Sequence, residues 1–295
     1  FNTPLKVGDR ILAVDQKPVA SDDTDAYLYL SNLLETSAMR DLSLTVQHLD
    51  GEEEIVDLKR IPYLGHPIVE ADIILNDFEV ILSEIQEACL EAEIDFESIT
   101  SESGCGQFEV TLKHRDALLA ADDALFLKII TKGVAIKHGL TATFMAKPYL
   151  NQPGNGMHVH FSILDNNGQN IFSNGGNFGS KFLTNAIGGC ISAMKASTLI
   201  FAPFENSYER LTPRAHAPTG ISWAYENRTA AIRVPMGSPS SKRIEHRVAG
   251  GDANPYLLFT AILGAALKGI EDQMDAPKPI QGDAYSLNLQ QMEKN

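Results

Sequence analysis

Histidine, glutamate and arginine recur at alternate positions in three short segments, residues 107–112, 156–164 and 242–248. Successive side chains of a β-strand point to opposite faces, so each segment would form a strand with one apolar and one polar face. The polar faces hold Gln107, Glu109 and Thr111; His158, His160 and Ser162; and Arg243, Glu245 and Arg247. Carboxylates with a histidine suit Mg²⁺ or Mn²⁺, and arginine suits bidentate binding of carboxylate and phosphate. The pattern therefore predicts a metal–phosphate site on a sheet.

A solvated outer face is the alternative interpretation of any one of these strands, because antiparallel sheets often expose one face to water. Solvated faces use lysine and threonine freely, whereas these three faces hold glutamate, histidine and arginine with almost no lysine. The three strands taken together therefore favour a functional site.

Glycine-rich loops lead into two of the strands. Residues 101–106 contain Glu102, and residues 151–156 contain Gly154. Glycine allows a backbone to approach a ligand closely, so both loops are candidates for the edge of the site. Further arginines follow in two later loops, at Arg210, Arg228 and Arg233. Each of these arginines, taken singly, would more often be an ordinary surface residue.

Two parts of the chain differ in the length of their expected elements. Residues 1–64 contain short strands at 11–14, 42–49 and 54–59, a hairpin signal at Asp50-Gly51 and a helix at 24–35. Residues 65–295 contain helices at 72–91, 181–200 and 255–270. A further helix is expected between Asp116, a plausible N-cap, and Gly139, which follows its C-terminal end. Strands are expected between them at 96–101, 107–112, 141–147, 156–164, 229–234 and 242–248. This mixture predicts an α+β fold, with a domain boundary in the turn-rich stretch 61–67.

The composition excludes several classes of protein. The 295 residues include 24 Lys and Arg against 38 Asp and Glu, a formal net charge of −14, so no nucleic-acid partner is expected. The longest apolar stretch, 256–266, is too short to cross a bilayer, so no membrane span is expected. Three cysteines without disulfide or metal-site spacing indicate a reducing, cytoplasmic compartment.

Four motifs resemble the catalytic domain of the glutamine synthetase family, in family order, over roughly residues 68 to 275. The motifs are residues 156–160, 206–213, 227–235, and 243–247 together with 253–256. The resemblance implies a curved antiparallel sheet with flanking helices in residues 65–295, and a homo-oligomer. It also implies a two-step reaction, in which ATP phosphorylates the γ-carboxylate of glutamate and an amine then displaces phosphate.

The resemblance further implies a role for each candidate residue. The implied ligands of the catalytic Mg²⁺ or Mn²⁺ ions are Glu102, Glu109, His158 and Glu245. The implied contacts to the nucleotide or its phosphates are His160, Ser162 and Arg243. The implied contacts to glutamate and its transferred phosphoryl group are Gly154, Arg210, Arg228 and Arg247, and Arg233 steadies phosphate. Arg210, Arg228 and Arg233 are the expected catalytic residues.

The acceptor amine is either ammonia or a polyamine such as putrescine. Ammonia-using members of the family carry an acidic residue in the loop after the Asn-Ser-Tyr motif, where this sequence has His216. Residues 142–148 and 247–256 look most like the γ-glutamylpolyamine (γ-glutamylputrescine) synthetase branch. We therefore favour a polyamine, the alternative being a glutamine synthetase homologue whose sequence has drifted at one loop.

The family's N-terminal β-grasp domain and its upstream Glu-x-Glu strand are not recognisable in this sequence. Fewer carboxylates predict weaker Mg²⁺ binding, and a catalytically incomplete member that binds nucleotide or acts as a scaffold is the alternative function. Residues 6–14 and 42–60 instead resemble the second half of a PDZ domain, so residues 1–64 are expected to form a partial PDZ-like segment. It is either a fusion remnant or the product of joining two unrelated coding pieces.

Overall fold

A computed structural model describes residues 10–14, 17–18, 42–47, 51–58, 69–212 and 217–286. The chain divides into two units, residues 1–79 and 80–295. The helix expected at 24–35 and the acceptor-loop residue His216 lie outside the described residues. Among the helices that are described, none is long and apolar enough to cross a membrane.

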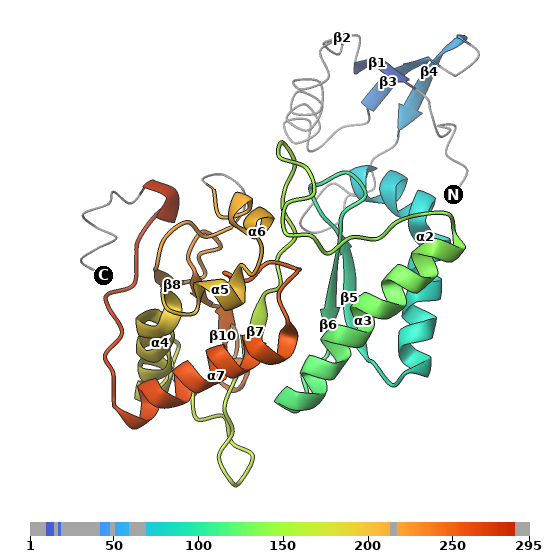
Figure 1. Cartoon of the computed structure of the whole chain (residues 1–295). Helices are drawn as coiled ribbons and strands as arrows, with labels where there is room; N and C mark the ends of the chain where they lie inside the picture. Colours follow the sequence, from blue (N-terminus) through green and yellow to red (C-terminus); the bar gives the residue numbers. More distant parts are fainter. Residues whose placement is uncertain are drawn as a thin grey trace. The chain divides into compact units, whose positions relative to one another are not determined.

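The first unit contains a four-stranded antiparallel sheet in the order β2-β1-β3-β4 (Figure 1). Its strands are β1 (Arg10–Val14), β2 (Lys17–Pro18), β3 (Leu42–Gln47) and β4 (Glu53–Leu58). Gly51, in the connection between β3 and β4, has a φ of +88°, which glycine adopts without strain. The expected strands and hairpin are confirmed, while the PDZ-like nature of residues 1–64 stays a prediction.

The second unit is built around a four-stranded sheet in the order β7-β10-β9-β8. Its strands are β7 (Val159–Phe161), β8 (Trp223–Tyr225), β9 (Ile232–Val234) and β10 (Ile244–His246). Strand β10 pairs antiparallel with both neighbours, but β8 runs parallel to β9, with Trp223 opposite Ile232. The sheet is therefore mixed rather than antiparallel. The reason is that residues 226–231 carry the chain back to the start of β8 before β9 begins.

A separate two-stranded sheet pairs β5 (Phe96–Ser101) with β6 (Phe108–Leu112). It follows helix α2 (Val69–Glu91) and precedes α3 (Ala117–Lys137). The Asp116 side chain accepts a hydrogen bond from Leu118 N at 3.0 Å, and Gly139 follows the helix with a φ of +70°. The predicted ends of this helix are confirmed, since both residues act as helix caps of the expected kind.

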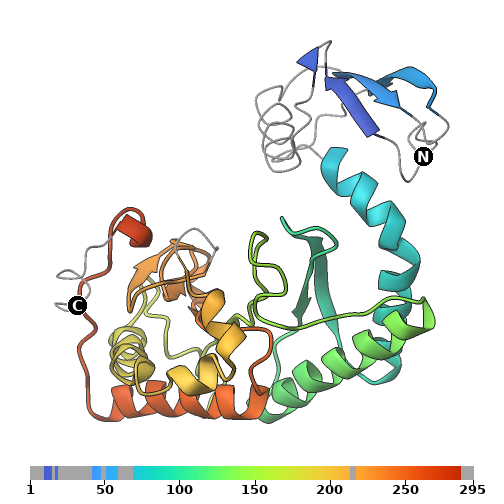
Figure 2. The ribbon, with the colours of Figure 1, turned by 45° about the horizontal axis from the view of Figure 1, so that its top comes forward.

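Helices α4 (Lys181–Met194) and α7 (Pro255–Glu271) pack along each other and cover the apolar face of the four-stranded sheet (Figures 1 and 2). The shared core includes Val159, Leu183, Ile187, Trp223, Ile232, Ile244, Leu258 and Ile262. The opposite face of this sheet is left for the polar side chains.

Two expected elements are wrong. Residues 141–147 form no strand, because the backbone there bonds to loop and side-chain groups, including Asn206 Oδ1, which accepts from Lys147 N at 2.9 Å. The helix expected at 181–200 is interrupted, because Thr198 Oγ1 donates to Lys195 O at 2.9 Å and takes up a carbonyl at the end of α4. The other helices among the described residues are α5 (Thr198–Phe201), α6 (Glu205–Glu209), η1 (Pro239–Ser241) and η2 (Ala284–Ser286).

Gly189 allows α4 to approach α7 closely. A Cβ at this position would lie 2.0 Å from Ala265 O and 2.7 Å from Gly269 Cα. We expect Gly189→Ala to lower the free energy of unfolding by about 2–3 kcal/mol, because the helices must separate. Gly264→Ala, in α7, is the matched control: its Cβ would meet nothing within 4 Å, and alanine should stabilise the helix by about 0.5–1 kcal/mol. Urea unfolding measures both, and equal losses would contradict the close approach.

Candidate functional site

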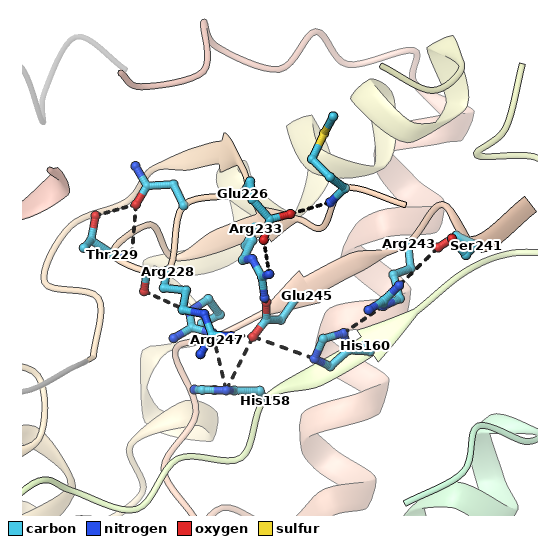
Figure 3. A network of polar contacts seen from close by, with 12 residues as sticks. His158, His160, Glu226, Arg228, Thr229, Arg233, Ser241, Arg243, Glu245 and Arg247 are labelled. Carbon is cyan, nitrogen blue, oxygen red and sulfur yellow. Dashed lines mark hydrogen bonds and ion pairs between the residues drawn. The ribbon is translucent and has the colours of Figure 1, made fainter. Parts of the chain in front are cut away.

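The polar face of β10 is centred on Glu245, whose side chain is almost fully buried. Its Oε1 accepts a hydrogen bond from Arg247 Nη1, and its Oε2 accepts one from Arg233 Nη1 at 2.8 Å (Figure 3). The same Oε1 lies 3.5 Å from His158 Nδ1 and 3.7 Å from His160 Nε2. The sheet register explains this cluster, because Glu245 stands opposite His160 on β7 and Arg233 on β9. Three neighbouring strands therefore place their polar side chains together.

The apolar face of β10 carries His246, as the alternation predicts. The His246 ring packs against Phe201, with ring centroids 4.8 Å apart. Burial lowers the pKa of His246 to about 3, and its buried Nδ1 has no hydrogen-bond partner in the described part of the chain. His246 is thus a neutral core residue, on the other side of the strand from Glu245.

Arg210 is the most deeply buried cation of the site, with 2% of its surface exposed. Within the described residues both of its hydrogen bonds go to backbone carbonyls, from Nη1 to Val248 O at 2.8 Å and from Nη2 to Arg247 O at 3.4 Å. Burial, and then repulsion from Arg247, lower the pKa of Arg210 to about 10. An anion bound beside Arg210 would stabilise the charged guanidinium and so oppose the pKa shift that burial and Arg247 cause.

The glycine-rich loop before β7, residues 151–156, packs closely against the side chain of Arg210. A Cβ on Gly156 would lie 2.5 Å from Arg210 Nη2, and a Cβ on Gly154 would lie 2.5 Å from Ala146 O and 2.9 Å from Arg210 Cγ. Only glycine fits at either position without a shift of the backbone or of Arg210. The close approach expected of this loop is therefore present.

His158 links the arginines to the carboxylates. Burial first, and then the charges of Arg247 and Arg210, hold the pKa of His158 well below its usual value. Its Nε2 is buried and lacks a hydrogen-bond partner among the described residues. A neutral imidazole with an unused nitrogen is a suitable metal ligand.

Glu109 brings a second carboxylate to the site from β6. Burial first, and then repulsion from Glu102 and from Glu245, raise the pKa of Glu109. Strand β6 belongs to the two-stranded sheet, so the site lies between two sheets rather than on one, which corrects the prediction. The reason is that β6 pairs with β5 and has no ladder with β7 or β10.

Gln107 joins the two glycine-rich loops. Its Nε2 donates to Gly154 O at 3.1 Å and to Asn155 Oδ1 at 2.9 Å, while its Oε1 accepts from Gly104 N at 3.1 Å. The sequence placed Gln107 on the polar face but gave no sign of this bridging role, which depends on contacts 47 and 48 residues away in the chain.

The donor chemistry of the carboxylates and His158 fits a hard divalent cation, since the repulsion at Glu109 and the unpartnered His158 Nε2 would both be relieved by one. However, no three histidine, cysteine, aspartate or glutamate side chains converge closely enough to hold an ion in the part of the chain that is described. Both carboxylate oxygens of Glu245 are bonded to arginines instead. The metal role of these residues stays a prediction.

The remaining predicted residues lie around this centre. Arg243 Nε donates to His160 Nδ1 at 3.1 Å (Figure 3). Arg228 is exposed, and its charge acts on both Glu109 and His158. Ser162 is exposed one residue beyond the end of β7. Their implied contacts to nucleotide and substrate stay predictions.

Two residues beside the site were missed by sequence reasoning. Glu226 contacts Arg233, and only its position directly before the 227–235 motif marked it (Figure 3). Tyr285 lies within electrostatic reach of Arg210 and Arg247. The neighbouring Ala284 N donates a hydrogen bond to Thr229 Oγ1 at 2.9 Å, which links this segment to the loop before β9. No spacing in the sequence signals this long-range contact.

Comparison with known proteins shows which family this chain is similar to. A family model described as glutamine synthetase, catalytic domain, matches residues 68–295. The γ-glutamylputrescine synthetase PuuA of Escherichia coli strain K12 is 40% identical over 210 residues, covering 71% of this chain and 44% of the relative. A glutamate–isopropylamine ligase of a Pseudomonas species is 40% identical over 210 residues, covering 70% of this chain and 46% of the relative.

The fold agrees with this match. A cryo-EM structure of Plasmodium falciparum glutamine synthetase superposes with a TM-score of 0.65 at 32% identity, covering 68% of this chain and 40% of that one. The chain thus spans less than half the length of these relatives. The resemblance carried by the four motifs is confirmed, because the matched range contains all of them. The chain belongs to the glutamine synthetase family, through a catalytic domain at residues 68–295.

Proposed function

We propose that this chain carries the catalytic part of an ATP-dependent ligase that joins the γ-carboxylate of glutamate to an amine through a γ-glutamyl phosphate. The observation that carries the proposal is the buried Arg210, which has only carbonyl acceptors in the described structure and lies beside Arg247. Burial and Arg247 lower the pKa of Arg210 even though the charge of Asp252 opposes them, so a further anion would stabilise this guanidinium and the site is suited to an anionic substrate. Glutamate and its acyl phosphate are such substrates.

Each polar group has a place in this proposal. Gly154, Arg210, Arg228 and Arg247 bind glutamate, while Arg233 stabilises charge on the transferred phosphoryl group. His160, Ser162 and Arg243 contact the nucleotide. Glu102, Glu109, His158 and Glu245 would hold Mg²⁺ or Mn²⁺, which supplies charge neutralisation for phosphoryl transfer when bound.

We propose an alkyl amine, with putrescine as the leading candidate, as the acceptor. Two relatives at 40% identity are named for putrescine and isopropylamine as acceptors. The sequence also has His216 where ammonia-using members carry an acid.

A homo-oligomer, a cytoplasmic location and a boundary between residues 1–64 and 65–295 complete the proposal. The three cysteines are unpaired, which suits a reducing compartment.

The test begins with calorimetric titration of a non-hydrolysable ATP analogue, with and without Mn²⁺. Phosphate release is then measured with glutamate and either putrescine, isopropylamine or ammonia. We expect metal-dependent binding, turnover fastest with an alkyl amine, and a loss of about 100-fold or more in Arg228→Lys, because a bidentate clamp is replaced by a point charge.

Turnover fastest with ammonia would overturn the acceptor proposal but keep the ligase. Nucleotide binding without turnover would favour the second candidate, a catalytically incomplete member that only binds nucleotide. That candidate is favoured by one observation, which is that no three metal-ligating side chains converge within the described residues. No binding at all would overturn both.

A further inference from the structure

Helix α6 is five residues long, and Arg210 follows it as its C-cap. So short a helix is not stable by itself and must be held by contacts from outside. Phe204, at its N-cap, has no polar side-chain atom that could bind the free N–H groups of the first turn. Ser207 supplies one acceptor, because its Oγ accepts a hydrogen bond from Phe204 N at 3.1 Å. The position of Arg210 therefore depends on what holds Ser207.

Ser207 is held by Asp252, a residue between β10 and α7. Ser207 is buried, and its Oγ donates a hydrogen bond to Asp252 Oδ2 at 2.6 Å. The other oxygen, Asp252 Oδ1, is buried and has no hydrogen-bond partner in the described part of the chain. A hydroxyl bonded to a charged carboxylate forms one of the stronger hydrogen bonds in proteins. The bond from Ser207 is thus the directed contact through which Asp252 acts on α6.

The segment 247–252 holds α6 at both of its ends. Asp252 binds the first turn through Ser207, while two carbonyls of the same segment bind the side chain that follows the last turn. These are Val248 O, at 2.8 Å from Arg210 Nη1, and Arg247 O, at 3.4 Å from Arg210 Nη2. Both the backbone of Arg210 and its guanidinium are therefore fixed relative to one segment.

This double attachment determines where the free donors of Arg210 point. A guanidinium has five N–H donors, and two of those on Arg210 are used by the carbonyls. The other three have no acceptor among the described residues and are left for an anion. Because the guanidinium is planar and rigid, a shift of α6 would turn all three donors together.

We infer that Asp252 is a positioning residue for Arg210, which fixes helix α6 through Ser207 and so directs the free donors of the guanidinium toward an anionic substrate. The inference rests on the proposed function for the identity of that substrate, glutamate. Asp252 acts through its hydrogen bond to Ser207 and not through its charge.

The bond and the charge are separated by substitution. Burial and Arg247 lower the pKa of Arg210, and the charge of Asp252 opposes them, so charge is the competing explanation. Asp252→Asn removes the charge but keeps an oxygen that accepts from Ser207 Oγ. Asp252→Ala removes both the charge and the bond. Ser207→Ala removes the bond and keeps the charge.

Asp122→Ala is the matched control. The Asp122 Oδ1 accepts a hydrogen bond from the Tyr256 hydroxyl, also at 2.6 Å, and this bond joins α3 to α7. The control therefore loses a hydroxyl–carboxylate bond of the same length that does not involve α6. Any loss of stability common to Asp122→Ala and Asp252→Ala is a structural effect, which the thermal midpoint measures.

Two further quantities are measured without metal or nucleotide. One is the dissociation constant of glutamate by calorimetry, and the other is the Arg210 Nε–H signal in ¹⁵N NMR spectra, assigned with Arg210→Lys. We expect Asp252→Ala and Ser207→Ala to shift this signal and to raise the dissociation constant about tenfold, because small displacements of a binding group are costly. Asp252→Asn should bind glutamate at least as tightly as the wild type, since it removes a negative charge near the anion. Asp122→Ala should change neither quantity.

An unchanged Arg210 signal in both Asp252→Ala and Ser207→Ala would overturn the inference. Equal losses of glutamate binding in Asp252→Asn and Asp252→Ala would also overturn it, because charge would then be the cause. If the wild-type chain binds no glutamate, the substrate part of the proposed function fails. The Arg210 signal in the same variants then decides alone whether Asp252 positions this arginine.

Discussion

Glu245→Gln is expected to reduce metal-dependent nucleotide binding by at least 100-fold and to lower the free energy of unfolding by about 3 kcal/mol. Glu245 is almost fully buried and pairs with Arg233 and Arg247. Glutamine keeps the volume and one carbonyl acceptor, but it leaves the buried guanidinium of Arg247 without its carboxylate and leaves Arg233 with Glu226 alone. The binding loss is measured by calorimetry with the ATP analogue and Mn²⁺, and the stability loss by urea unfolding.

The control for this experiment lies one residue along the strand. His246 points to the opposite face and packs against Phe201, so its replacement should leave binding unchanged. Alanine would open a cavity in the core at this fully buried position, and leucine is therefore the better substitution. Equal losses of binding in Glu245→Gln and His246→Leu, at a pH where both proteins are folded, would contradict the division of β10 into two faces.

Alternation along short strands was sufficient to find the centre of the site. The two-residue period separates Glu245 from His246 whatever the strand's neighbours are, because it depends only on local backbone geometry. The same rule placed His158 and His160 on one face, and the register of β7 with β10 then brought both within 4 Å of Glu245. Local pattern therefore predicted which side chains share a face.

Pairing between distant segments could not be predicted in the same way. The sequence did not reveal that β8 runs parallel to β9, or that β6 belongs to a separate sheet. It also missed Glu226, because the partner of its carboxylate is fixed by that parallel pairing. These features depend on tertiary contacts, which override local preference.

The loop arginines could be found in the sequence, but not from local periodicity. No periodicity marks Arg210 or Arg228, and only the family resemblance gave them roles. The structure supplies a physical reason for attention to Arg210, since it is buried against two carbonyls and two close-packed glycines. Burial of a cation can be recognised only once the fold is known.

His246→Leu is expected to remove much of the loss of stability that the chain undergoes in acid. The pKa of His246 is lowered to about 3 by burial, against an ordinary value of 6.5. Between these two values the unfolded chain binds a proton that the folded chain does not. Stability therefore falls as the pH drops below about 6.5, and it is unaffected by this group at higher pH.

The size of this effect follows from the shift. At about 1.4 kcal/mol per pKa unit, His246 alone would cost on the order of 5 kcal/mol once the pH approaches 3, and about 2 kcal/mol near pH 5. Leucine has no proton to bind and also removes the unpartnered Nδ1, so the variant should match or exceed the wild type at pH 8.

Urea unfolding of both proteins at pH 8, 6, 5 and 4.5 measures the difference directly. His158 and His160, whose pKa values are also lowered, contribute equally to both proteins and cancel from it. The stability difference in favour of leucine should be constant above pH 7 and should widen steadily below pH 6. Parallel curves over the whole range would contradict this prediction. They would mean that His246 is protonated in the folded chain as readily as in the unfolded one, and therefore that its ring is not fully buried against Phe201 as the fold described requires.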